Sequence, residues 1–89
     1  MKNKKDIYTV NVIGDGLLRH QSLQDDKKNA KELALQYAID HHEEYAEDGY
    51  LKVLVFKEGN SYGDDFVTVN FGDSLEEIKK DIAMAFEEK

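Results

Sequence analysis

The sequence has 89 residues, the size of one domain, and its formal net charge is -7, with 12 Lys and Arg against 19 Asp and Glu. It has no cysteine, which excludes disulfides and thiolate chemistry, and its negative charge disfavours binding to nucleic acid. No stretch approaches the ~20 apolar residues of a membrane span, and no apolar segment of a signal peptide follows the first lysines. We therefore expect a cytoplasmic protein with no membrane contact, made of a basic disordered tail over 1–5 and a single domain over 6–89.

The first half of the chain predicts a hairpin followed by a helix. Residues 7–13 are rich in β-branched side chains and predict a strand, and the Asp-Gly pair at 15–16 favours a tight turn into a return strand over 17–23. A plain two-residue turn would pair Ile13 with Leu18 and Tyr8 with Leu23. The helix is expected from about 26 to 48, with Asp25 or Asp26 as its N-cap and Gly49 as its terminator.

This first helix carries two apolar stripes more than 90° apart. One contains Leu33, Tyr37 and His41, and the other contains Leu35 and Ile39. A helix that covers a sheet usually needs a single stripe. We therefore expect it to contact the sheet and, in addition, either the second helix or another chain.

The second half predicts a strand over 50–57, a loop over 58–65, a strand over 66–71 and a helix that begins at Ser74. Ser74 and Glu77 have the spacing of a capping box. The order indicates an α+β fold, ββαββα, with a four-stranded and mainly antiparallel sheet and both helices packed on one face. The core is expected to contain Val10, Val12, Leu33, Tyr37, Val53, Val55, Val67, Val69, Ile78, Ile82 and Phe86.

The strand over 50–57 has apolar residues on both of its faces. With both helices on one side of the sheet, Tyr50, Leu54 and Phe56 would be exposed together on the other side. Monomers rarely leave such a patch open. We expect a second copy of the chain, or a different protein, to cover these three side chains.

The stretch DHHEEYAEDG, residues 40–49, concentrates carboxylates without a single Lys or Arg. On a helix, several of these acids would be like-charge neighbours four residues apart, each pair costing roughly 0.2–0.5 kcal/mol. Negative charge at a helix C-terminus is also unfavourable. Two interpretations follow, a solvated helix end or a partner-binding patch, and the patch would contain Asp40, Glu43, Glu44, Glu47 and Asp48.

The sequence predicts no catalytic, metal or cofactor site. His41 and Glu44 could converge on a helix, but zinc needs about four ligands, and His20 lies on a predicted strand. No serine stands in a nucleophile elbow, and the glycine-containing loop over 58–65 lacks the lysine of a phosphate loop. We therefore do not expect an enzyme.

Three functional hypotheses remain open. The first is a small acidic adaptor or inhibitor that docks on a basic surface of a larger protein, acting as a mimic of nucleic-acid charge. The second is a self-associating structural homodimer. The third, which the charge disfavours, is a nucleic-acid binder that uses the sheet aromatics Tyr8, Tyr50, Phe56 and Phe66. The Lys-, Asp-, Glu- and Asn-rich composition also suits a phage or mobile-element protein.

Overall fold

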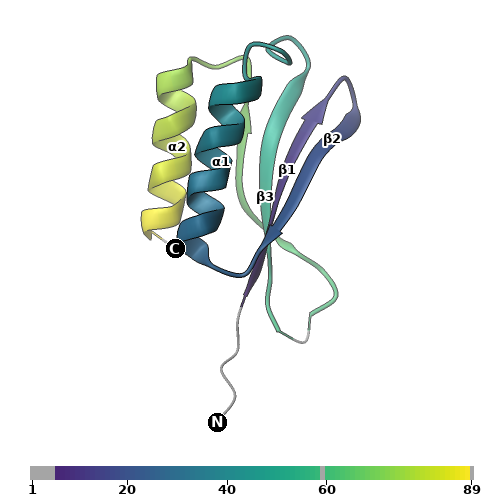
Figure 1. Ribbon diagram of the computed structural model, residues 1–89, viewed down its shortest axis with the longest axis vertical. Coiled ribbons are helices and arrows are strands. Elements are labelled where there is room, and N and C mark those ends of the chain that lie inside the picture. The colour runs from purple at the N-terminus through teal and green to yellow at the C-terminus, as the bar shows by residue number, and fades with distance from the viewer. Residues whose placement is uncertain (1–5, 59, 89) are drawn as a thin grey trace.

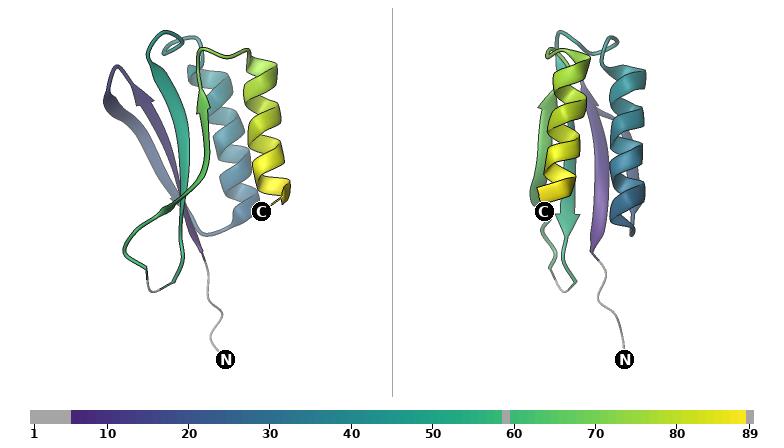
Figure 2. Two further views of the ribbon diagram at one scale, coloured as in Figure 1. Left: turned by 180° about the vertical axis from the view of Figure 1, so that it is seen from behind. Right: turned by 90° about the vertical axis from the view of Figure 1, so that its left-hand side faces the viewer.

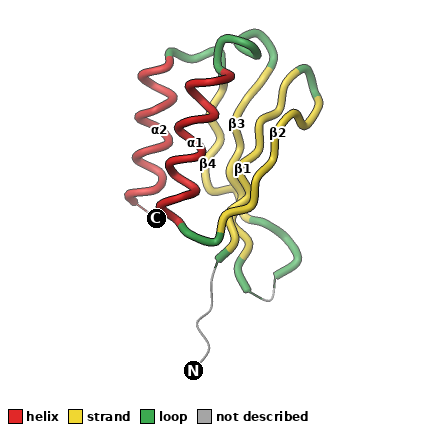
Figure 3. The backbone as a smooth tube through the Cα atoms, in the orientation of Figure 1, coloured by secondary structure: helices red, strands yellow, loops and turns green. Residues whose placement is uncertain are grey.

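The computed structural model describes residues 6–58 and 60–88, so the tail predicted over 1–5 lies outside the described part of the chain. The elements follow the predicted order, and the α+β class is confirmed (Figures 1 and 3). Their bounds are β1 Ile7–Gly14, β2 Leu17–Gln24, α1 Lys27–His41, β3 Gly49–Phe56, β4 Asp64–Asn70 and α2 Leu75–Glu88.

The four strands form one open sheet in the order β2-β1-β3-β4, and each neighbouring pair is antiparallel. Both helices lie on the same face of the sheet, as predicted, and Figure 2 shows them side by side in front of it. We call this the inner face and the opposite one the outer face. Within the described residues, no helix is long and apolar enough to cross a membrane.

The first hairpin has the predicted turn but a different register. Asp15 and Gly16 both have positive φ, at 55° and 76°, as a two-residue turn requires. Ile13 pairs with Leu18 as expected, but a bulge at Arg19 then shifts the pairing by one residue, so that Thr9 and not Tyr8 faces Leu23. Since side chains alternate between faces, the shift sends His20 to the inner face and Leu23 to the outer one.

Helix α1 is shorter than predicted. It begins after Asp26, whose carboxylate accepts a hydrogen bond of 3.1 Å from the backbone N–H of Lys28. It ends at His41, so the prediction that it runs to Asp48 is wrong, and Gly49 begins β3 and does not terminate the helix. The penalties for like charges and for negative charge at the helix end explain part of this early stop. The packing of Tyr45 on Gly14 and Gly49 explains the rest, because it draws the chain away from the helix axis toward the strand ends.

Helix α1 packs against both the sheet and α2; in its second apolar stripe Leu35 is half-buried against the core, whereas Ile39 stays exposed. The side chains that it buries completely are three alanines four residues apart, Ala30, Ala34 and Ala38. Such small side chains allow a close approach. Leu33 and Leu35 flank them and are half-buried against the core.

The core lies between the inner face of the sheet and the two helices. Eight of the predicted core residues are buried, whereas Leu33, Tyr37 and Val67 are only half-buried at its margin. Helix α2 begins as predicted after Ser74, whose hydroxyl accepts from the Glu77 N–H at 3.2 Å, and it buries Ile78, Ile82 and Phe86. The prediction missed the three alanines of α1 and four larger buried side chains, Tyr8, Leu51, Phe66 and Phe71.

Candidate functional site

The acidic stretch forms an ordered connection between α1 and β3, and Tyr45 anchors it. The Tyr45 ring lies directly on the backbone of Gly14. A Cβ added at Gly14 would overlap the ring, at 2.6 Å from both Cγ and Cε1. A Cβ at Gly49 would lie 2.5 Å from Tyr45 Cβ. Gly14 and Gly49 are paired across β1 and β3, so two adjacent strand ends together form the surface on which Tyr45 packs.

Backbone hydrogen bonds hold the rest of this connection. The N–H groups of Tyr45 and Asp48 donate to the carbonyls of His41 and Tyr45, each at 3.2 Å. The Asp15 N–H, at the tip of the first hairpin, donates to the carbonyl of Asp48 at 2.7 Å. The acidic segment is therefore fixed at both of its ends, by α1 and by the hairpin turn.

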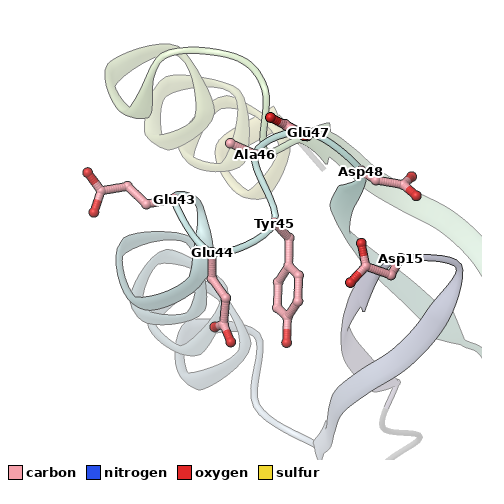
Figure 4. Close-up of a pocket in the computed structure, with 7 residues that line it drawn as sticks. All are labelled: Asp15, Glu43, Glu44, Tyr45, Ala46, Glu47 and Asp48. Atoms are coloured by element: carbon pink, nitrogen blue, oxygen red, sulfur yellow. The ribbon is translucent and has the colours of Figure 1, made fainter.

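A pocket of about 330 Å³ opens at this end of the molecule, and we call it the acidic pocket. Figure 4 shows the Tyr45 ring at its centre, with the Glu44 carboxylate on one side and the Asp15 carboxylate on the other. Within the described residues, no Lys, Arg or His lines it. Its lining consists of Asp15, Glu43, Glu44, Tyr45, Ala46, Glu47 and Asp48.

Four of the five predicted patch residues line this pocket. The fifth, Asp40, does not, and it accepts a hydrogen bond of 3.0 Å from the Gln36 amide on the exposed side of α1. Asp15, which was not among the predicted patch residues, joins the pocket from a distant part of the chain. The only available signal was its Asp-Gly turn, which indicates a hairpin tip but not what that tip touches.

A stacked pair of histidines and one arginine support the Tyr45 ring. The rings of His20 and His41 stack with their centroids 4.3 Å apart, and His41 also lies 6.2 Å from the Tyr45 ring. Arg19 also lies over the Tyr45 ring, with its guanidinium carbon 5.8 Å from the ring centroid, and pairs with Asp15 at 3.4 Å. Aromatic stacking and a cation–π contact therefore hold Tyr45 in addition to the glycines.

Two pKa shifts belong to this arrangement. His41 Nδ1 lies 3.0 Å from Glu44 Oε1, and this hydrogen bond is the main reason that the pKa of Glu44 is lowered. Burial, followed by the nearby charge of Glu44, raises the pKa of Tyr45. Glu44 therefore stays ionised at neutral pH, which suits electrostatic attraction and does not suit a general acid.

Among the described residues, no group of three or more His, Asp or Glu side chains could hold a metal ion. The pocket acids are exposed and spread around a rim, so they can attract a cation-rich surface without enclosing an ion.

The remaining predicted residues lie elsewhere. Tyr50, Leu54 and Phe56 all lie half-buried on the outer face, and Tyr50 is about 13 Å along the strand from Leu54. Of the four aromatics suggested as a nucleic-acid platform, Tyr8 and Phe66 are core residues in edge-to-face contact at 5.4 Å. The other two, Tyr50 and Phe56, lie half-buried on the outer face.

Comparisons of the chain with protein-family models, with curated proteins and with solved structures found no match.

Proposed function

We propose that this protein is a non-enzymatic binding module that docks its acidic pocket on a basic surface of a larger protein, as an adaptor or inhibitor. The observation that carries the proposal is the pocket itself. Five carboxylates, those of Asp15, Glu43, Glu44, Glu47 and Asp48, surround one concave surface, and no described cation lines it. Arg19 pairs with Asp15 and His41 with Glu44 from beside the pocket, which leaves the other three carboxylates without a described ion pair. A basic surface that normally holds nucleic acid would accept this arrangement of charge.

The position of the charges favours docking over a merely solvated helix end. Frayed acids at a helix terminus would be mobile and well screened by salt. Here Tyr45 is seated on Gly14, and the Asp15 N–H holds the carbonyl of Asp48, so the carboxylates start from a fixed frame. A prearranged surface loses less conformational entropy when it binds, which strengthens binding without further contacts.

Recognition of this kind depends on salt and on the sign of the charge. Two protein surfaces of opposite electrostatic potential associate faster and more selectively, and dissolved salt weakens this attraction. We expect the tagged protein to retain a specific protein from nuclease-treated lysate at low salt and to release it at high salt. Added double-stranded DNA should compete for the same partner if the pocket mimics nucleic-acid charge.

The deciding comparison uses two triple variants that change the net charge equally. The first, Glu43→Lys/Glu44→Lys/Glu47→Lys, reverses the pocket, and the control, Glu32→Lys/Glu58→Lys/Asp81→Lys, reverses exposed acids away from it. The pocket variant should lose the partner while keeping its circular dichroism spectrum, and the control should retain the partner. Equal loss in both variants would reduce the effect to net charge, and no loss in either would refute the proposal.

A further inference from the structure

The outer face of the sheet carries a second concave surface, at the opposite end of β1 from the acidic pocket. A groove of about 420 Å³ lies here, lined by Ile7, Thr9, Gln21, Leu23, Leu54 and Phe56. Leu23 is 63% exposed at its rim. We call this surface the outer groove. It exists because the bulge at Arg19 sends Leu23 to the outer face.

The side-chain amide of Asn11, beside the outer groove, is already satisfied within the chain. Asn11 is 6% exposed, and its amide nitrogen donates to the carbonyls of Thr9 and Lys52, both at 3.1 Å. Its side-chain oxygen accepts from the Gln21 amide at 2.8 Å. Covering this face would therefore leave the Asn11 amide paired, so its burial would add little desolvation cost.

The charge distribution determines which occupant fits. Among the described residues, Lys52 is the only charged side chain that β1, β2 and β3 direct outward, because Arg19 turns toward Tyr45. Strand β4 adds one acid, Asp65, which pairs with Leu54 and is exposed. Two copies of a chain of net charge -7 repel each other wherever their acids meet. The described strands thus direct one Lys and one Asp to the outer face, so a second copy can approach this face with little net repulsion, whereas a basic partner would be drawn to the acidic pocket.

The size of the face also matches a second copy. Three of the strands have eight residues and β4 has seven, so the sheet is about 26 Å long and about 19 Å wide, which gives roughly 1,000 Å² over two copies, about the minimum for a specific interface. We propose that the outer faces of two copies pack against each other about a twofold axis. The exposed Leu23 of each copy then enters the outer groove of its partner, since a twofold interface is self-complementary.

Sedimentation velocity between about 10 µM and 1 mM tests this pairing. We expect the wild-type protein to change from monomer to dimer over this range, and added salt should favour the dimer by screening the repulsion. Leu23→Glu and Leu54→Glu should each keep the protein monomeric. Ile39→Glu is the matched control, because Ile39 is 45% exposed on α1, on the helix side of the molecule. Circular dichroism melting verifies that each variant is folded.

Three results would overturn the proposal. The first is a wild-type protein that stays monomeric over the whole range. The second is a dimer that Ile39→Glu disrupts and Leu54→Glu does not. The third is a dimer that Leu23→Glu disrupts but Leu54→Glu leaves intact, which would place the contact at the exposed edge of β2 and not on the sheet face. Added salt distinguishes the two interactions, because it should strengthen the dimer and weaken the docking of a partner on the acidic pocket.

Discussion

The contact between Tyr45 and Gly14 can be tested without changing any charge. In Gly14→Ala the new methyl group would overlap the Tyr45 ring, which must then leave its seat. Gly14 has no positive φ, so alanine fits the backbone there, and the contact alone should determine the cost. Overpacking of this kind costs about 1–3 kcal/mol in the free energy of unfolding.

The same contact can be measured by removing the Tyr45 ring instead of adding a methyl group at Gly14. Tyr45 is half-buried, so Tyr45→Ala should lose about 1–2 kcal/mol of burial, with about 0.5–1 kcal/mol more from the Arg19 cation–π contact. Once the ring is gone, Gly14→Ala should cost nothing, or should stabilise by about 0.4–1 kcal/mol by restricting the unfolded chain. The two changes should therefore be coupled by about 1–3 kcal/mol.

Urea denaturation of the wild type, both single variants and the double variant, followed by circular dichroism, measures this coupling. Gly16→Ala is the control, because its φ of +76° makes alanine strained while nothing lies within 4 Å of the added Cβ. Its cost should be about 1–2 kcal/mol and independent of Tyr45. If Gly14→Ala costs the same with and without the Tyr45 ring, the proposed anchoring of the acidic segment is wrong.

Two further predictions concern the core and the pocket. Ile82 is completely buried, so Ile82→Ala should lower the free energy of unfolding by about 2–5 kcal/mol, and a melting temperature within a degree or two of wild type would contradict its placement. The lowered pKa of Glu44 means that its stabilising contribution is present above the unfolded value of about 4.5 and is lost as the pH falls through the folded value. An NMR titration should therefore find the Glu44 carboxyl below the ordinary range in the wild type and closer to it in His41→Ala; an unchanged midpoint would rule out the His41 hydrogen bond as its cause.

Local sequence signals were enough to predict the order of the elements and several of their boundaries. The Asp15-Gly16 turn, the Asp26 cap and the Ser74 cap all appear where they were expected, because each depends on residues within a few positions of one another. The alternation and the helical spacing of apolar residues likewise predicted the fold class and most of the large core side chains. The concentration of acids in one stretch could also be read directly.

The C-terminal end of α1, the register of β2 and the shape of the pocket depended on contacts between distant residues. The helical pattern continues past His41, but the chain leaves the helix there and Tyr45 packs on Gly14 and Gly49, one of them more than thirty positions away. A single bulge at Arg19 reverses the faces of His20 and Leu23, and so creates both the histidine stack and the outer groove. A sequence pattern shows which side chains alternate along a strand, but the tertiary packing decides where a bulge shifts that alternation. The bulge itself costs little free energy, and the contacts that favour it come from residues far away in the sequence.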